Sequence, residues 1–285
     1  MRRTGFLAAS LAGAAALWLA GWDAGFFLLD LTVPRSGYRV VRDVAYGADP
    51  RQKLDIYVPE NLRQPAPVLL FFYGGSWQSG ARGNYRAFGQ AFASEGIVTI
   101  IADYRLYPQV KYPAFVEDAA AALAWVHGHI AERGGDQERI FVAGHSAGAY
   151  NAAMVASEPG FIKRAGGDLS WIRGVIGIAG PYDFLPLKDP AYIDIFHGAG
   201  NRDAMPVNHL NGKRPPMLLA WGLEDETVGA VNIDHMEAKL KSLGSPVDVH
   251  RYPGIGHVGI ILSLARGFRG RTTLHQDMLR FIRTR

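Results

Sequence analysis

Residues 139–148 read Arg-Ile-Phe-Val-Ala-Gly-His-Ser-Ala-Gly, and this stretch decides the fold. Its first half is apolar enough for a buried strand, and the run 147–157 that follows is compatible with a helix. A turn this sharp needs glycine at Gly144 and Gly148, because a Cβ there would strike the neighbouring backbone. The pattern predicts a nucleophile elbow, in which a strained Ser146 presents its hydroxyl above a sheet. The alternative is an ordinary strand-to-helix turn.

A serine nucleophile needs a base to take its proton, and the base needs an acid to orient it. In this kind of site the acid and then the base follow the serine along the chain. Asp225 follows a predicted strand at 216–221, and His257 follows another at 247–252. Because the carboxyl ends of parallel strands meet at the edge where ligands bind, Ser146, Asp225 and His257 are predicted to converge as a catalytic triad.

The acid and the base both have competitors in the sequence. Glu224 and Glu226 flank Asp225, so the acid could be displaced by one position. Asp183, which follows another predicted strand, is a second candidate for the acid. The chain has nine histidines, and only His257 lies on a glycine-rich loop after the last predicted strand.

The loop before the predicted base also fits a dinucleotide fingerprint, with glycines at Gly254, Gly256 and Gly259. A real fingerprint opens a βαβ unit that leads into further strands. Only a short, helix-compatible segment follows Gly259, so we reject a nucleotide cofactor.

A second glycine-rich loop, Tyr-Gly-Gly-Ser-Trp-Gln-Ser-Gly at 73–80, follows a predicted strand at 68–72. Glycines let the backbone turn its N–H groups toward a cleft, where they can bind a developing oxyanion. We expect the oxyanion hole to consist of the N–H groups of Gly75, Ser76 and, at the elbow, Ala147. The alternative is a plain β-turn.

Three ring side chains beside these loops are candidate substrate-binding residues. Trp77 could wall the pocket or pack in the core. Tyr73 could hydrogen-bond and hold its own loop. His145 precedes the serine, and its side chain could instead point away from the cleft.

Taken together, the motifs resemble those of α/β-hydrolases, most closely bacterial esterases of the hormone-sensitive-lipase-like type with a His-Gly-Gly-x-Trp loop. The resemblance covers roughly residues 38–262. The segments that carry it are 73–77, 103–108, 113–125, 144–148, 222–228 and 256–257. Tyr73 replaces the usual His, and Ser76 replaces the third Gly. The resemblance implies serine-dependent hydrolysis of carboxylic esters through an acyl-enzyme, without a metal or an organic cofactor.

The resemblance also implies an α/β fold, a mostly parallel sheet with helices on both faces. The runs 38–46 and 52–58 predict an antiparallel pair, and strands alternate with helices from residue 68 onward. The stretch 180–216 breaks this rhythm and is interpreted as a cap insertion. Asp103 and Arg105 are expected to pair with each other and to anchor the loop near the elbow, with no part in the chemistry.

Composition limits the alternatives. A chain of 285 residues can bury one sizeable core. It contains no cysteine, which excludes disulfides, thiol catalysis and cysteine metal sites. The net charge is only +4, and no basic stripe is interleaved with stacking aromatics, so a nucleic-acid partner is not expected.

Two alternative kinds of function remain open. An amidase, peptidase or formamidase would use the same triad, and a non-catalytic binding module is the alternative from another class.

The first residues suggest a membrane or export signal. Arg2 and Arg3 precede residues 5–22, which carry no charge. We therefore assign 1–33 to a hydrophobic leader, favour an uncleaved anchor with the enzyme on the periplasmic side, and assign 38–285 to the catalytic domain. A cleaved signal peptide and an apolar helix packed on a cytoplasmic enzyme are the alternatives.

Overall fold

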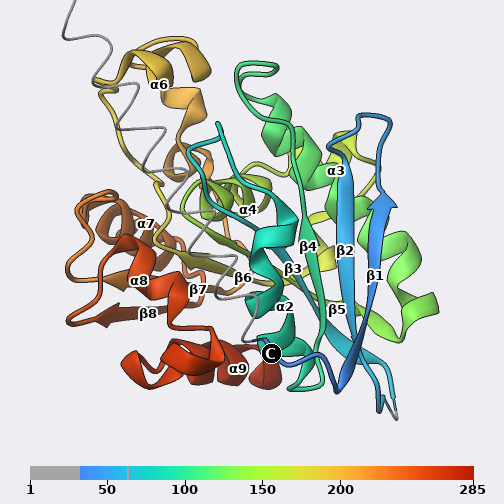
Figure 1. Ribbon diagram of the computed structural model, residues 1–285. Helices are drawn as coiled ribbons and strands as arrows, with labels where there is room; N and C mark the ends of the chain where they lie inside the picture. Colours follow the sequence, from blue (N-terminus) through green and yellow to red (C-terminus); the bar gives the residue numbers. More distant parts are fainter. Residues whose placement is uncertain (1–32, 63) are drawn as a thin grey trace, which may run out of the picture.

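The computed structural model describes residues 33–62 and 64–285 (Figure 1). The apolar run 5–22, predicted as an anchor, lies outside the described residues. Within the described part of the chain, no helix combines the length and the apolar character that crossing a membrane requires.

A single eight-stranded sheet runs through the described residues in the order β1-β2-β4-β3-β5-β6-β7-β8. Both pairings of β2, with β1 and with β4, are antiparallel, and all the others are parallel. The strands are β1 (Tyr38–Ala45), β2 (Lys53–Pro59), β3 (Ala66–Phe72), β4 (Val98–Ala102), β5 (Gly135–His145), β6 (Ile172–Ile178), β7 (Met217–Gly222) and β8 (Val247–Tyr252). The predicted antiparallel pair and the predicted mostly parallel sheet are confirmed.

Helices cover both faces of this sheet. The α-helices are α2 (Arg86–Ala93), α3 (Ala114–His129), α4 (Ala147–Ser157), α5 (Gly160–Arg164), α6 (Pro190–Ile195), α7 (Val231–Ser242), α8 (His257–Leu262) and α9 (Leu274–Thr284). In Figure 1, α2 and α9 lie in front of the sheet, whereas α3 and α4, which pack against each other, lie behind it. Phe88 of α2 stacks on Phe71 of β3 with ring centroids 3.8 Å apart, and Phe281 of α9 contacts Phe141 of β5 edge-on.

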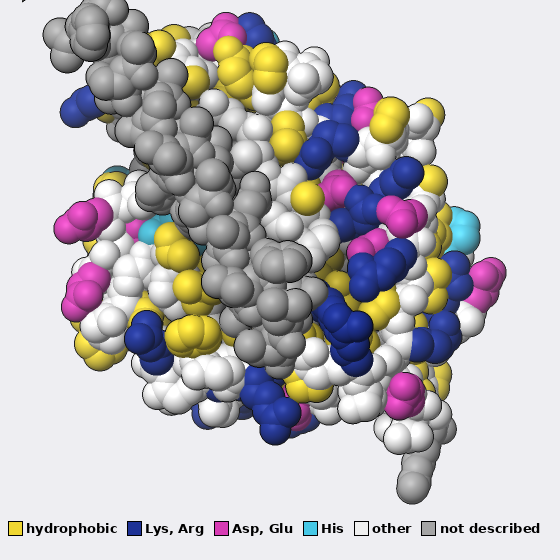
Figure 2. Space-filling view, viewed as in Figure 1, with side chains coloured by type: hydrophobic (Ala, Val, Ile, Leu, Met, Phe, Trp, Pro, Cys, Tyr) yellow, Lys and Arg dark blue, Asp and Glu magenta, His cyan; other side chains and the backbone are white. Residues whose placement is uncertain are grey.

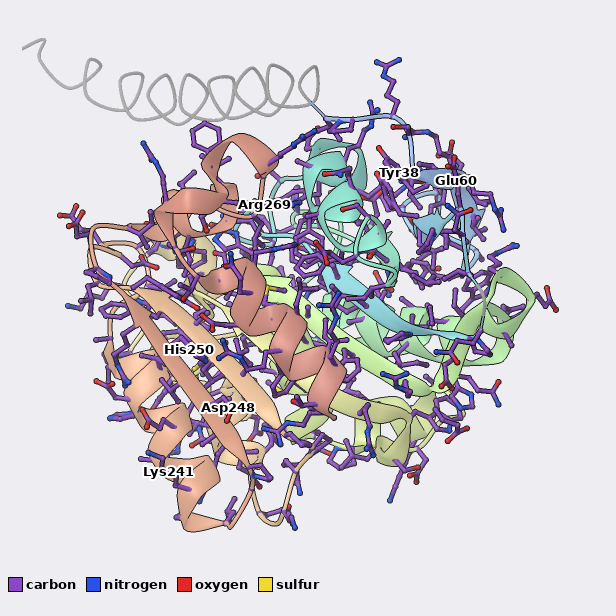
Figure 3. All side chains as sticks on the ribbon, turned by 90° about the horizontal axis from the view of Figure 1, so that it is seen from below. Tyr38, Glu60, Lys241, Asp248, His250 and Arg269 are labelled. Carbon is purple, nitrogen blue, oxygen red and sulfur yellow. The ribbon has the colours of Figure 1, made fainter. Side chains whose placement is uncertain are left out.

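The middle of the sheet is the core of the molecule. From Val68 to Phe72, every residue of β3 is buried, and so is all of β4. Strands with helices on both faces need apolar residues on both faces, which explains the unbroken apolar runs that predicted them. Figure 3 shows the two edges far apart, with Asp248 and His250 of β8 on one side and Tyr38 of β1 and Glu60, just after β2, on the other.

The stretch 180–216 connects β6 to β7 and carries α6 and two short 3₁₀ helices, Arg202–Ala204 and Pro206–His209. Ion pairing of Lys111 with Asp194, at 2.6 Å, ties α6 to the body of the molecule. The large apolar side chains of Ile195, Phe196 and Met205 in this stretch are fully buried. They therefore seal this segment on the core and do not line the pocket described below.

Candidate active site

The elbow forms where β5 ends and α4 begins. Ser146 lies between them with φ 54° and ψ −123°, a conformation that side-chain-bearing residues rarely adopt. A Cβ added at Gly144 would lie 2.2 Å from the backbone of Gly148, and one added at Gly148 would lie 2.0 Å from the carbonyl oxygen of Phe72. Both glycines are therefore required by the close approach of β5, α4 and β3.

Three side chains from three loops meet at this elbow. Nε2 of His257 lies 2.9 Å from Oγ of Ser146, and Nδ1 of His257 lies 2.7 Å from Oδ2 of Asp225. Both His257 and Asp225 are buried. With its hydrogen on Nδ1, the imidazole donates to the carboxylate and offers its Nε2 lone pair to the serine hydroxyl.

The two oxygens of Asp225 have separate partners. Oδ1 accepts hydrogen bonds from the backbone N–H groups of Thr227 and Val228, at 2.9 and 2.8 Å. Oδ2 is left for the imidazole of His257. The backbone of the 222–228 loop therefore sets the direction of the carboxylate.

The competing acids lie elsewhere. Glu224 and Glu226 are exposed, whereas Asp225 is buried against the imidazole. Asp183 pairs with Nδ1 of His235 at 2.7 Å and does not line the pocket beside Ser146. Of these four carboxylates, only Asp225 hydrogen-bonds to His257.

The loop expected to form the oxyanion hole packs against the elbow. A Cβ added at Gly74 would come within 2.9 Å of Cβ of Ser146. Gly75, Ser76 and Trp77 all have positive φ, of 131°, 55° and 59°. Three consecutive residues in this region bend the chain sharply, and Ser76 and Trp77 line the same pocket as Ser146.

A buried network holds this loop at both ends. The hydroxyl of Tyr73 donates to Oδ1 of Asp103 at 2.7 Å and accepts from Nη2 of Arg51 at 2.8 Å. The same Nη2 donates to the carbonyl of Gly80, and the hydroxyl of Tyr104 donates to the carbonyl of Tyr73. Tyr73 has no exposed surface and is absent from the pocket wall, so its predicted contact with substrate was wrong.

His145 was also expected at the substrate, and the structure corrects this as well. Its side chain is 1% exposed and lies under the elbow, where Nε2 donates to the carbonyl oxygen of His257 at 2.9 Å. Burial lowers the pKa of His145 to about 3, so its imidazole is neutral at ordinary pH. Its contact is with the backbone of His257, not with the pocket.

Asp103 and Arg105 were predicted to pair with each other, and this prediction was wrong. Arg105 pairs with Asp118 of α3, with Nη2 and Oδ1 2.7 Å apart, and not with Asp103. Asp103 instead pairs with Arg82 and accepts from Tyr73. Asp103 and Arg105 therefore anchor the same segment to different elements, Arg105 to α3 and Asp103 to Arg82.

A pocket of about 320 Å³ opens beside Ser146. Most of its wall is apolar and comes from the 180–216 stretch, which the sequence marked only as a whole by its proline and aromatic content. The wall residues from that stretch are Pro181, Phe184, Pro186, Leu187, Lys188, Asp189 and Tyr192. Trp77 also lines the pocket while remaining almost fully buried, with its indole N–H donating to Asn151. No cluster of three His, Asp or Glu side chains able to hold a metal occurs within the described ranges.

The model of one protein family, described as BD-FAE, matches residues 54–240 of this chain. The chain belongs to the BD-FAE family. The matched region of this BD-FAE protein contains the elbow, the 73–80 loop, the 180–216 stretch and Asp225, and it ends before His257.

Individual relatives agree with this assignment. A probable isoprenylcysteine α-carbonyl methylesterase of Arabidopsis thaliana is 32% identical and covers 78% of this chain, and Esterase LipC of Mycobacterium tuberculosis is 31% identical and covers 79%. The chain spans about half the length of the first (52%) and 61% of the second. Esterase B from Lactobacillus rhamnosis superposes with a TM-score of 0.81 over 97% of this chain and 96% of its own, at 22% identity. The predicted α/β-hydrolase fold and the predicted resemblance to hormone-sensitive-lipase-like esterases are confirmed.

Proposed function

We propose that this chain hydrolyses carboxylic esters through an acyl-enzyme formed on Ser146. The observation that carries the proposal is the unbroken hydrogen-bond relay from Ser146 through His257 to Asp225, at 2.9 and 2.7 Å, beside a largely apolar pocket. Relatives named esterase and methylesterase support the same reaction class.

The reaction proceeds in two halves. His257 takes the hydroxyl proton of Ser146 through Nε2 while the serine oxygen attacks the ester carbonyl, and Asp225 stabilises the imidazolium. The oxyanion accepts hydrogen bonds from the N–H groups of Gly75, Ser76 and Ala147. His257 then gives its proton to the leaving alcohol. Water, activated by the same imidazole, releases the acid and restores the serine.

The pocket favours small esters. Its volume of about 320 Å³ is near the lower end of the range for small-molecule sites, roughly 300–1,000 Å³. The aromatic and proline side chains around it leave little length for an acyl chain. We therefore expect short acyl groups to be hydrolysed faster than long ones.

Hydrolysis of a nitrophenyl ester series from acetyl to palmitoyl tests the proposal directly. Turnover should be fastest at the short end, and Ser146→Ala should lose it and also lose labelling by a fluorophosphonate probe. Ser157→Ala, at the far end of α4, is the matched control, because the Ser157 hydroxyl is buried without a hydrogen-bond partner. Cleavage of amides with no turnover of any ester would overturn the assignment.

We further propose, from sequence alone, that residues 5–22 attach the enzyme to a membrane with the catalytic domain on the periplasmic side. Support comes from the length of the uncharged run and from the two arginines that precede it. Fractionation of cells producing the chain with and without residues 1–32 tests this. Recovery of both forms in the cytoplasmic fraction would contradict it.

A further inference from the structure

Ser76 occupies a backbone position that suits glycine better. Its φ is 55°, in the left-handed region where a Cβ is unfavourable. Strain that persists beside a reactive serine indicates a use for the strained side chain.

The hydroxyl of Ser76 has a specific partner in the 180–216 stretch. It accepts a hydrogen bond from the hydroxyl of Tyr192, at 3.0 Å and across 116 positions of sequence. Both residues line the pocket together with Ser146 and Ala147. Because Tyr192 is the donor, the hydrogen of the Ser76 hydroxyl remains available to a group in the pocket. Accepting a hydrogen bond also polarises that hydroxyl and strengthens it as a donor.

Tyr192 is itself held in place by contacts with other parts of the molecule. Its ring meets the indole of Trp77 edge-on, at 6.1 Å between centroids and 88° between planes. One turn later in α6, the backbone carbonyl of Ile195 accepts from the N–H of Tyr112 at 3.0 Å. The position of the tyrosine hydroxyl relative to the 73–80 loop is therefore fixed before substrate arrives.

We propose that Ser76 is a catalytic residue whose hydroxyl donates a side-chain hydrogen bond to the oxyanion, and that Tyr192 is the positioning residue that orients it. When Ser146 attacks, the carbonyl π electrons move onto oxygen, and the Ser76 hydrogen bonds to that oxygen while remaining on Oγ. A donor aimed in advance at developing charge stabilises the transition state more than the substrate. This inference rests on the proposed ester hydrolysis.

Ser76→Gly tests the inference without threatening the fold. Glycine removes the hydroxyl and relieves the positive φ, so the thermal midpoint should not fall. We expect kcat to fall by about 10²- to 10³-fold with KM within about twofold, because one oxyanion donor is lost. Affinity for a trifluoromethyl ketone, which forms an oxyanion adduct with the nucleophilic serine, should fall in parallel with kcat/KM. Wild-type kcat in Ser76→Gly would overturn the inference.

Tyr192→Phe should reproduce the fall in kcat seen in Ser76→Gly. The double variant should lose little more, because both changes remove the same hydrogen-bonded pair of hydroxyls. Tyr112→Phe is the matched control. It deletes a tyrosine hydroxyl that donates to the carbonyl of Asp203 and thereby holds the same stretch, but it leaves Ser76 untouched. Equal losses of kcat in Tyr112→Phe and Tyr192→Phe would assign the effect to anchoring and refute an orienting role.

The two proposals fail differently. A wild-type protein that hydrolyses no ester and resists the fluorophosphonate probe would refute the proposed function. Wild-type turnover together with an unchanged Ser76→Gly variant would refute only the role of Ser76.

Discussion

The role of each side chain in this site depends on which of its atoms faces which partner. Asp225 directs one oxygen to two backbone N–H groups and the other to His257. That division follows from the 222–228 turn, whereas the sequence identified only the residue and its place after a strand. His145 shows the same limit, because the sequence placed it in the motif but did not decide that its ring contacts the carbonyl of His257.

Asp225→Asn should lower kcat by roughly 10³- to 10⁴-fold with little change in folding. The two backbone N–H groups will keep the amide oxygen at Oδ1, so the amide nitrogen must face Nδ1 of His257. An N–H donor there forces the imidazole hydrogen onto Nε2, which then cannot accept the proton of Ser146. Steady-state kinetics measure the fall in kcat, and a urea titration checks that folding is little changed. A variant that retains a tenth of wild-type kcat would argue for another acid.

At the scale of elements, close approach of strand and helix decides which glycines matter. Gly148 lies on α4 where that helix crosses the end of β3, and a Cβ there would meet backbone and not a flexible side chain. Gly128 lies near the end of α3 and has nothing within 4 Å of an added Cβ. Composition cannot separate two such glycines, but the predicted elbow did mark Gly148.

Gly148→Ala should fail to fold or give low soluble yield, because the 2.0 Å approach to the Phe72 carbonyl forces α4 away from the sheet. Gly128→Ala should instead stabilise the protein, by about 0.5–1 kcal/mol, because alanine favours helix. Soluble yield, circular dichroism and urea midpoints of the pair measure both effects. A well-folded, active Gly148→Ala enzyme would contradict the account of the elbow.

At the scale of the whole molecule, many charged side chains of the described residues form ion pairs with side chains of opposite charge. On the face seen in Figure 2, Lys and Arg side chains lie among Asp and Glu side chains. Arg82 illustrates this, since it pairs with Asp43, Asp55 and Asp103 and thereby joins β1, β2 and the end of β4. The stability of the whole fold also depends on pH, because burial keeps the imidazole of His145 neutral in the folded protein.

Stability should fall as the pH drops from about 6.5 toward about 3, the window in which unfolded His145 binds a proton and folded His145 does not. Above this window the full stability is present. The contribution of His145 to the slope is at most about 1.4 kcal/mol per pH unit. His145→Gln, which keeps a donor for the carbonyl of His257, should show a flatter slope in urea titrations from pH 4.5 to 7.5. If the free energy of unfolding changed with pH equally steeply in the wild type and in His145→Gln, His145 would not be the source of the pH dependence.

The sequence by itself determined the strands, the elbow and the chain order of serine, acid and base, because these follow from local apolar runs and from glycines at fixed spacing. Only the tertiary structure decided that Arg105 pairs with Asp118, that Tyr73 holds its loop, and that Tyr192 meets Ser76. Such contacts join segments far apart in the chain. Their geometry depends on how helices and the 180–216 stretch pack on the finished sheet, and no local pattern carries that information.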